Sequence, residues 1–507
     1  MGEAGSTDGV RARGSPRVLL VDPYIAREDP MERKFVELYP SLGLLTLAAF
    51  LRQEHLQVEI ADLTFDRDLE QVRRRLQHFR PDVIGVHTKT MMFRRSKEIA
   101  ALARAHGTFS IAGGPDSATS PEPYLDAGFD SVVFGEGELT LLELARAVHE
   151  GQDPIGLRGV VRRGPKGVVH GASRPFIRDL DQLPLPAWDL VDMEAYLSRW
   201  ESRTGERRSA ILTSRGCPFD CSWCSKPAFG RTYRQQSPER VLLELRALKE
   251  RYHVDYVRFC DDVFGISRPW LTELLDRMIE ERLDLRFECL ARVDLLKPDL
   301  LAPMCRAGLE RVYVGVESGS QKMLDLMNRG TRLAQIERTA ESLREHGIRQ
   351  FWFLMLGYPG EDLEDIEATL ALFRRFSPEE YSVSIAVPVP GTRFFEAVRD
   401  RLLRKTTVTR SSGGRSLLYE AAYPEALYRW QQARFEWEAA LQKARGRIPD
   451  GLLEQLSHAA DRFHHEIATP LLLGRRRVKD AEAAEGAGHA VPLPMVRNEA
   501  GPRRPIG

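Results

Sequence analysis

The first third of the chain alternates short apolar runs with longer amphipathic segments. Runs typical of buried strands occur at residues 17–22, 57–63, 83–87, 109–112 and 131–134. Between them, apolar residues recur at helical spacing at residues 41–53, 69–79, 94–105 and 139–149, with a short helix expected near 121–127. Strands and helices in this alternation indicate parallel βαβ units. We therefore predict an N-terminal doubly wound, Rossmann-like α/β domain over residues 16–150.

The same alternation returns in residues 206–400. Strands are expected at residues 209–213, 256–260, 286–290, 311–315, 350–356 and 381–386, with helices between them. Six such units make a partial, TIM-like (β/α)6 barrel, and active sites of the eight-unit barrel lie at the C-terminal ends of its strands. Residues 151–205 are Gly-, Arg- and Pro-rich, which predicts a small hairpin and then an ordered linker.

The ends of the chain have a different composition. Residues 401–473 predict a helical C-terminal region, with helices at 424–443 and 449–467 and a polar, mobile stretch at 405–415. Aromatic residues in these helices are expected to pack against the barrel rather than to contact a substrate. Residues 1–15 and 474–507 are polar or rich in Ala, Gly and Pro, which predicts disorder.

Charge and hydropathy narrow the possible partners and location. The 73 Lys and Arg residues balance the 73 Asp and Glu residues, so no overall charge favours nucleic acid or an anionic membrane. No run of apolar residues is long enough to cross a bilayer, and the N-terminus lacks the apolar segment of a signal peptide. We expect a cytoplasmic protein without a membrane span.

Three of the six cysteines lie within eight residues, on a loop that follows a predicted strand. Cys217, Cys221 and Cys224 have the spacing C-x3-C-x2-C, and their thiolates suit zinc, copper(I) or iron–sulfur centres. Three ligands on a four-iron cluster leave one iron open to a substrate. A zinc site completed by another cysteine or a histidine is the alternative. A disulfide is less consistent with a chain that has no export signal.

The cysteine spacing, with Trp223 just before the third cysteine, resembles that of radical S-adenosylmethionine (SAM) enzymes. The resemblance implies a [4Fe-4S] cluster whose open iron binds SAM and whose electron, supplied by a flavodoxin or ferredoxin, releases a 5′-deoxyadenosyl radical. The SAM contacts that it implies are Trp223, Asp261, Asp262, Arg292, Glu317, Ser318 and Gly357. Most follow predicted barrel strands, and the alternative is that they form only salt bridges at the rim.

Three motifs in the first domain carry a second resemblance. Residues 40–51, then Gly113-Gly-Pro-Asp116, then Gly135-Glu-Gly-Glu138 are similar to the cobalamin-binding domain of class B radical SAM enzymes, in a subgroup related to anaerobic magnesium-protoporphyrin IX monomethyl ester cyclase. The implied cobalamin contacts are Thr88, Thr90, Gly113, Gly114, Pro115, Asp116, Gly135, Glu136, Gly137 and Glu138. The alternative is that the glycines only form turns and that the two glutamates favour a helix start.

The chain departs from many cobalamin proteins at the first strand. Those proteins carry D-x-H-x-x-G there, with a histidine that ligates cobalt, whereas this chain reads Asp22-Pro-Tyr-Ile-Ala-Arg27. Within the radical SAM family this absence is common and implies a cobalt with no protein ligand below it. His87, at the end of the third predicted strand, is the alternative ligand.

Together these features favour a cobalamin-dependent radical SAM methyltransferase that acts on an unactivated carbon of a small molecule. Two alternatives stay open: a cyclisation or oxidative rearrangement with the same cofactors, and a zinc- or cobalamin-binding regulatory module without turnover. The remaining cysteines, Cys260, Cys289 and Cys305, are expected to be buried structural thiols.

Overall fold

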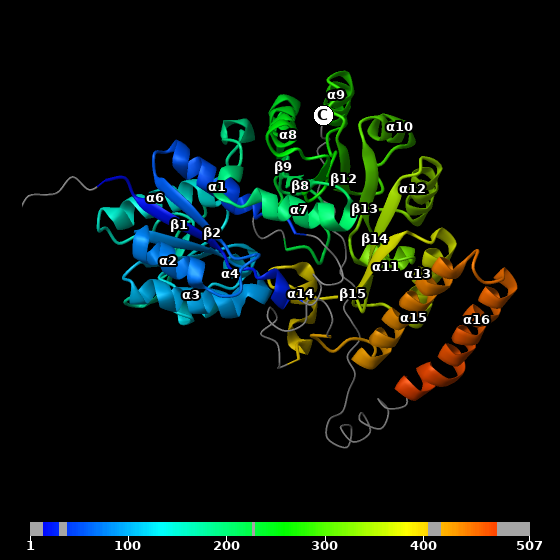
Figure 1. The fold of residues 1–507 in the computed structure, drawn as a ribbon. Coiled ribbons are helices and arrows are strands. Elements are labelled where there is room, and N and C mark those ends of the chain that lie inside the picture. Colours follow the sequence, from blue (N-terminus) through cyan, green and yellow to red (C-terminus); the bar gives the residue numbers. More distant parts are fainter. Residues whose placement is uncertain (1–13, 30–37, 226–228, 404–416, 474–507) are drawn as a thin grey trace, which may run out of the picture. The chain divides into compact units, whose positions relative to one another are not determined.

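The computed structural model describes residues 14–29, 38–225, 229–403 and 417–473. The chain divides into two units, residues 1–422 and 423–507, and each is described by itself. The first unit contains both predicted α/β parts, which confirms the fold class (Figure 1). Within the described residues, no helix is both long and apolar enough to cross a membrane. Three predictions lie outside the described residues: the disorder of the N-terminus (apart from residues 14 and 15), the mobile stretch at 405–415 and the disorder of the tail.

The N-terminal sheet has seven strands in the order β2-β1-β3-β4-β5-β6-β7. The first five are parallel: β1 (Arg17–Asp22), β2 (Gln57–Asp62), β3 (Val83–His87), β4 (Phe109–Gly113) and β5 (Ser131–Val133). Helices α2 (Glu70–His78), α3 (Phe93–Ala105) and α5 (Glu122–Asp126) cover one face. Helices α1 (Leu42–Gln53) and α6 (Gly137–His149) pack together over the other face.

Three elements in and after this domain differ from the predicted pattern. The hairpin expected in the linker forms as β6 (Val160–Gly164) and β7 (Gly167–His170), but β6 pairs antiparallel with β5 and so extends the sheet. A short helix, α4 (Pro115–Thr119), begins where a loop was expected, because Pro115 suits a first helical position. Helix α7 (Met193–Thr204) was not predicted, and Asp192 caps it through the amide of Ala195.

The second sheet has six parallel strands in the order β15-β14-β13-β12-β11-β8, as the six-unit prediction requires. The strands are β8 (Arg208–Ile211), β11 (Tyr256–Phe259), β12 (Arg286–Ala291), β13 (Leu309–Glu317), β14 (Arg349–Leu356) and β15 (Glu380–Ile385). The helices are α8 (Pro238–Tyr252), α9 (Arg268–Glu280), α10 (Pro298–Arg306), α11 (Gln321–Leu326), α12 (Leu333–Glu345), α13 (Leu363–Phe376) and α14 (Arg393–Val398). Figure 1 shows the helices α8, α9, α10 and α12 along one side of these strands.

Short elements connect the larger ones. Strands β9 (Ser214–Arg215) and β10 (Arg234–Gln235) form a two-stranded antiparallel ribbon beside the cysteine loop. Turns of 3₁₀ helix are Ala26–Glu28, Thr90–Met92, Leu180–Gln182, Trp188–Leu190 and Arg399–Arg401. In the second unit, the two predicted helices form as α15 (Glu425–Ala444) and α16 (Asp450–Phe463), followed by a π-helical turn at His464–Ala468.

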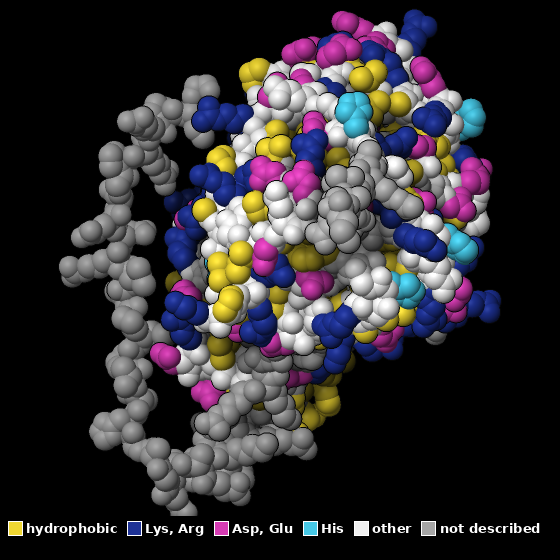
Figure 2. Space-filling view, turned by 90° about the vertical axis from the view of Figure 1, so that its left-hand side faces the viewer, with side chains coloured by type: hydrophobic (Ala, Val, Ile, Leu, Met, Phe, Trp, Pro, Cys, Tyr) yellow, Lys and Arg dark blue, Asp and Glu magenta, His cyan; other side chains and the backbone are white. Residues whose placement is uncertain are grey.

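The surface carries both signs of charge. Figure 2 shows Lys and Arg side chains interspersed with Asp and Glu side chains over the visible face of the molecule. This distribution agrees with the balanced composition of 73 basic and 73 acidic residues. The visible face therefore has no broad region of one sign that would attract a polyanion.

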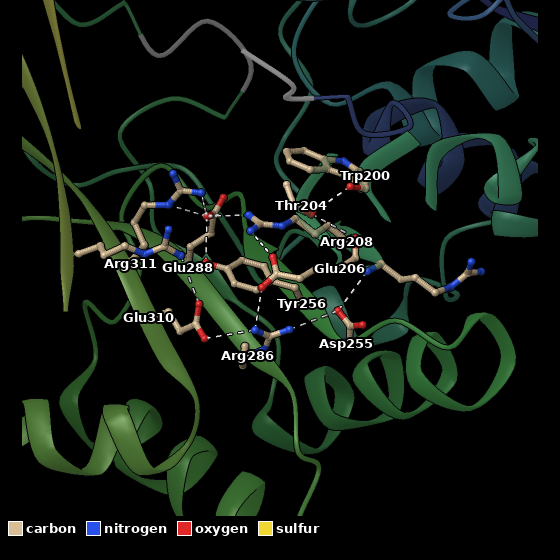
Figure 3. Close-up of polar contacts among 12 residues, drawn as sticks. Trp200, Thr204, Glu206, Arg208, Asp255, Tyr256, Arg286, Glu288, Glu310 and Arg311 are labelled. Carbon is tan, nitrogen blue, oxygen red and sulfur yellow. Dashed lines mark hydrogen bonds and ion pairs between the residues drawn. The ribbon is translucent and has the colours of Figure 1, made fainter. Parts of the chain in front are cut away.

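The interior of the barrel contains a charged group at its centre, Glu288 of β12. Figure 3 shows this carboxylate between Arg311 and Arg208, next to the ring of Tyr256. Arg311 donates from Nε and Nη2 at 2.9 and 2.6 Å, and the Tyr256 hydroxyl donates at 3.2 Å. Glu288 is 1 % exposed, so these contacts replace its lost hydration. The barrel interior thus contains a buried ionic layer.

The Glu288→Gln substitution would leave Arg311 without a full buried counter-charge. We expect it to lower the free energy of unfolding by on the order of 3 kcal/mol. The matched control is Glu310→Gln, because Glu310 also pairs with arginines but is 32 % exposed, where such pairs contribute about 1 kcal/mol or less. Urea denaturation of both variants measures the difference, and equal losses would contradict this account of the barrel interior.

Candidate cofactor site

The loop that carries the three cysteines is held to the barrel by Asp261, the second residue after β11. Its carboxylate accepts hydrogen bonds from the amides of Thr213 and Ser214 at 2.7 and 2.8 Å, and from the Thr213 hydroxyl at 2.5 Å. Burial raises the pKa of Asp261 to about 6, against the opposing effect of these hydrogen bonds. Asp261 therefore fixes the start of the cysteine loop, and its predicted contact with SAM stays a prediction.

Backbone geometry also defines this loop. Gly216 precedes the first cysteine with φ of +86°, and a Cβ there would lie 1.8 Å from the Thr232 carbonyl oxygen. Only glycine fits so close an approach between the two sides of the β9–β10 ribbon. The Ser222 amide donates to the Met327 carbonyl at 3.0 Å, which ties the other end of the loop to the segment after α11.

The cysteines lie in a cationic setting. Cys217 and Cys221 are buried and Cys224 is exposed. The guanidinium of Arg329 approaches Cys221 Sγ at 3.5 Å, and that of Arg292 approaches it at 4.0 Å. The positive charges of both arginines suit an anionic group bound by these sulfurs. Arg292 was predicted from its place after a strand, whereas no sequence pattern marked Arg329.

The other predicted SAM residues of the barrel lie around this loop. Glu317, at the end of β13, is 8 % exposed, has φ of +64° and lies 3.9 Å from Arg329. Burial raises the pKa of Glu317, while Arg329 and Arg292 oppose the rise. A positive φ is costly for glutamate, and such strain is concentrated at functional sites. The structure thus places Glu317 and both arginines together beside Cys221.

The remaining predicted SAM contacts have varied surroundings. The hydroxyl of Ser318 is fully buried against Thr369 Oγ1 at 3.0 Å. Arg292 binds Asp294 through two nitrogens at 2.9 and 3.1 Å. Trp223 is half-buried, with the Arg329 guanidinium 5.8 Å from its ring centre, and Asp262 is exposed. Direct SAM contact by each of these residues stays a prediction.

Gly357, the last predicted SAM contact, depends on a residue that the sequence did not mark. Its amide donates to Glu361 Oε2 at 2.6 Å, and its φ is +77°. Glu361 is 2 % exposed, and burial raises its pKa to about 8, with nearby Asp365 and Asp362 adding to the rise. The turn after β14 is therefore held by a carboxyl group that keeps its proton at neutral pH.

A cavity of about 850 Å³ lies between the C-terminal ends of the strands of the N-terminal sheet and the barrel. On the N-terminal side, Leu20, Gly85 and Ile111 of the sheet face Leu44 and Leu141 of α1 and α6. The barrel contributes Arg258, Cys260, Tyr313, Phe351, Phe353 and Tyr381. One face of the cavity is thus an apolar slot between sheet and helices, and the other is the mouth of the barrel.

Glycines open the slot to a ligand. Gly113, Gly114, Gly135 and Gly137 line it, as predicted for cobalamin contacts, together with Pro115, Glu136 and Glu138. At Gly114, φ is +131° and a Cβ would lie 2.6 Å from the Thr88 carbonyl oxygen. At Gly137, a Cβ would lie 3.0 Å from Leu47. At Gly113 and Gly135 no atom lies within 4 Å of the position of a Cβ, so larger residues there would extend into open space. The slot therefore fits a bulky, partly apolar cofactor tail.

The other predicted cobalamin residues do not line the cavity. Thr88 is fully buried and donates to the Gly113 carbonyl and to Ser117 Oγ. Thr90 donates to Asp116 at 3.0 Å, and Asp116 also accepts from Tyr124. These residues shape the loops around the glycines, and their direct contact with cobalamin stays a prediction.

Glu136 and Glu138 have partners that the sequence did not indicate. Arg215, two residues before Cys217, donates to Glu136 at 2.9 Å and to Glu138 at 2.6 Å. Arg234 of β10 adds a bond to Glu136 at 2.8 Å. Burial lowers the pKa of Arg215, but the two carboxylates outweigh this effect and the net shift is upward. This buried ion cluster joins the glycine-rich loop of the first domain to the cysteine loop of the barrel.

Cys260 corrects one expectation. It was expected to be buried with Cys289 and Cys305, but it is exposed and lines the cavity. The reason is strand alternation: Tyr256, Arg258 and Cys260 point to the barrel interior, and only the last two reach the open part. Cys289 is buried as expected, and Cys305 is half-buried on α10.

The residues present fit the groups that the motifs imply. Three cysteines beside two arginines suit an anionic iron–sulfur cluster with one open iron. The glycine cradle and apolar slot suit the tail of cobalamin, at the strand ends where doubly wound sheets bind ligands. The fold and site therefore define an enzyme that combines a cobalamin-binding sheet with a radical SAM barrel.

Comparison with known proteins agrees. Residues 211–373 match the radical SAM superfamily, and residues 32–145 match the B12 binding domain. An uncharacterized methyltransferase of Pyrococcus horikoshii is 31 % identical over 76 % of this chain and 84 % of its own length. The chain therefore belongs to the radical SAM superfamily, in the form that carries a B12-binding domain. Its cofactors are a [4Fe-4S] cluster, SAM and cobalamin.

Two further proteins are similar. The anaerobic magnesium-protoporphyrin IX monomethyl ester cyclase of Rubrivivax gelatinosus is 28 % identical, over 72 % of this chain and 67 % of its own length. A solved structure is also similar: that of the radical SAM methyltransferase TsrM from Kitasatospora setae, with cobalamin and a [4Fe-4S] cluster bound. The TM-score is 0.65 and the sequence identity 22 %, and the match covers 76 % of this chain and 75 % of the TsrM chain. The latter likeness confirms the fold.

Asp261 offers a test of how the cysteine loop is held. Asp261→Ala removes the acceptor of two buried amides. Each unsatisfied amide then destabilises the folded loop by about 1–3 kcal/mol. We expect this variant to lose most of its iron after anaerobic reconstitution. Asp261→Asn is the matched control, because its oxygen still accepts from the amides while its NH2 donates to the Thr213 hydroxyl. Iron per chain is the measurement, and equal iron in both variants would contradict the anchoring role.

Glu361 gives a pH-dependent prediction. In the unfolded chain its carboxyl ionises near its model value of 4.5, but in the folded protein it stays protonated up to about pH 8. The unfolded state thus binds fewer protons between these values, so rising pH lowers the free energy of unfolding by at most about 1.4 kcal/mol per pH unit. Glu361→Gln should remove this contribution. Urea denaturation from pH 5 to pH 8 should show the free energy of unfolding of the variant rising relative to that of the wild type as the pH increases. Parallel pH dependences would refute the assignment.

Proposed function

We propose that the protein is a C-methyltransferase that transfers a methyl group to an unactivated carbon of a small molecule. The carrying observation is that Arg215, two residues before Cys217, lines the cavity together with the cobalamin-type slot and binds Glu136 and Glu138 of the glycine-rich loop. A substrate in that cavity would lie between the two cofactors. When bound, these cofactors supply a 5′-deoxyadenosyl radical on one side and a methyl group on the other.

Each part of the chain has a defined task in this proposal. Cys217, Cys221 and Cys224 hold the cluster, and Arg329 and Arg292 offset its negative charge. Glu317 beside these arginines suits the amino group or ribose of SAM, because a buried carboxylate accepts strong hydrogen bonds. The Gly357 turn gives backbone access at the same strand ends.

The barrel side of the cavity suggests the kind of substrate. Tyr313, Phe351, Phe353 and Tyr381 offer aromatic surface to an apolar body. Arg258 lines the same side, with its guanidinium 4.4 Å from the Tyr313 ring centre and 3.6 Å from Glu288. We propose a small-molecule substrate, an external flavodoxin- or ferredoxin-type electron donor and a cytoplasmic location.

One alternative has a specific observation behind it. The similarity to the Rubrivivax cyclase favours a cyclisation or oxidative rearrangement that uses the same cofactors without methyl transfer. The name of the Pyrococcus relative favours methyl transfer. Whether the protein can transfer the SAM methyl group to cobalamin separates the two reactions.

The proposal is testable before the substrate is identified. The reconstituted protein is reduced with dithionite and given SAM with a deuterated methyl group. We expect both 5′-deoxyadenosine and deuterated methylcobalamin, measured by mass spectrometry. 5′-Deoxyadenosine without methylcobalamin would favour the cyclase alternative. The absence of both products would overturn radical chemistry. Cys221→Ala should lose iron and 5′-deoxyadenosine, whereas Cys305→Ala, with its half-buried thiol on α10, should keep both.

A further inference from the structure

His87 is the last residue of β3, at the carboxyl end of the N-terminal sheet and on the side of the cobalamin-type slot. In the parallel register of β1 and β3, Leu20 is beside Gly85, and both line the cavity. Side chains alternate along strands, so Asp22 and His87, two residues further on, share that face. Both also line the cavity. An imidazole and a carboxylate therefore stand together at the mouth of the slot.

The imidazole ring is held from two sides. Its Nδ1 lies 3.6 Å from Asp22 Oδ2 and 3.4 Å from the hydroxyl of Ser41, the residue before α1. Its Cδ2 lies 3.1 Å from the position of a Cβ on Gly114, so the glycine leaves room for the ring. Because Nδ1 has these two neighbours and His87 lines the cavity, Nε2 is the ring nitrogen that remains for a ligand.

Asp22 is suited to orient this ring. It is 8 % exposed. Its Oδ2 lies 3.6 Å from Nδ1 of His87. A carboxylate behind one imidazole nitrogen fixes the tautomer and strengthens the other nitrogen as a metal ligand. The same arrangement recurs behind metal-bound histidines in many proteins.

We propose that His87 Nε2 is the lower-face ligand of cobalt when cobalamin is bound. The imidazole would come from the end of β3, in place of the histidine that D-x-H-x-x-G proteins carry after β1. Imidazole is a common ligand of first-row transition metals. This inference requires bound cobalamin but not methyl transfer, so it stands or falls separately from the proposed reaction.

Electron paramagnetic resonance of the protein loaded with cob(II)alamin tests the assignment. One axial nitrogen-14 ligand splits each resolved cobalt line into a triplet. The nitrogen of the cofactor's own tail base would do the same, so the full-length protein is also prepared with uniform nitrogen-15 and loaded with unlabelled cofactor. We expect the triplet to become a doublet in the labelled protein. A triplet that persists would assign the ligand to the tail base, and lines without splitting would exclude any nitrogen; either result overturns the proposal.

Variants locate the ligand within the protein. His87→Gln should abolish the nitrogen splitting while cobalamin remains bound. The matched control is His149→Gln. His149 pairs with Asp82 of the same domain at 3.2 Å, and its side chain is 16 % exposed, against 17 % for that of His87. Unlike His87, it does not line the cavity. This control should keep the splitting. Retention in His87→Gln, or loss in His149→Gln, would contradict the assignment.

Discussion

The buried ion cluster around Arg215 is the interaction on which the arrangement of the site depends. Its guanidinium reaches Glu136 and Glu138 of the first domain from a position two residues before Cys217. All three side chains are nearly inaccessible to water. Removing one member of such a cluster leaves a buried charge without its partner, which costs far more than an exposed pair does. The cluster therefore fixes the glycine-rich loop and the cysteine loop relative to each other.

The same physical rule places the chemistry in both sheets. Parallel strands end together at one edge, so polar and glycine residues that follow successive strands gather there. In the first domain this edge carries Asp22, His87 and Gly114, and in the barrel it carries Asp261 and Glu317. Because the loops that follow these strands meet, groups far apart in the sequence become neighbours without any local signal. The Arg215–Glu136 pair spans 79 positions in this way.

Sequence patterns predicted the elements and the three cysteines because these depend on local periodicity and spacing. They did not predict the partners of these residues, because the partners come from other elements. Asp261 was predicted to contact SAM, and the structure adds that its oxygens accept from the amides that begin the cysteine loop. Glu136 and Glu138 were predicted to contact cobalamin, and the structure adds that they bind Arg215. No pattern marked Arg329 or Glu361, and the exposure of Cys260 was not predicted, since only the folded barrel determines their surroundings.

The charged interior of the barrel extends to the cavity. Glu288 is surrounded by three arginines, and two of them, Arg311 and Arg208, have further acidic partners in Glu380 and Glu206. The third, Arg258, has Glu288 as an acidic neighbour at 3.6 Å and lines the cavity. Its guanidinium lies 4.4 Å from the ring centre of Tyr313, which lines the cavity as well. The ionic layer therefore continues to the cavity wall, where an arginine lies beside aromatic side chains.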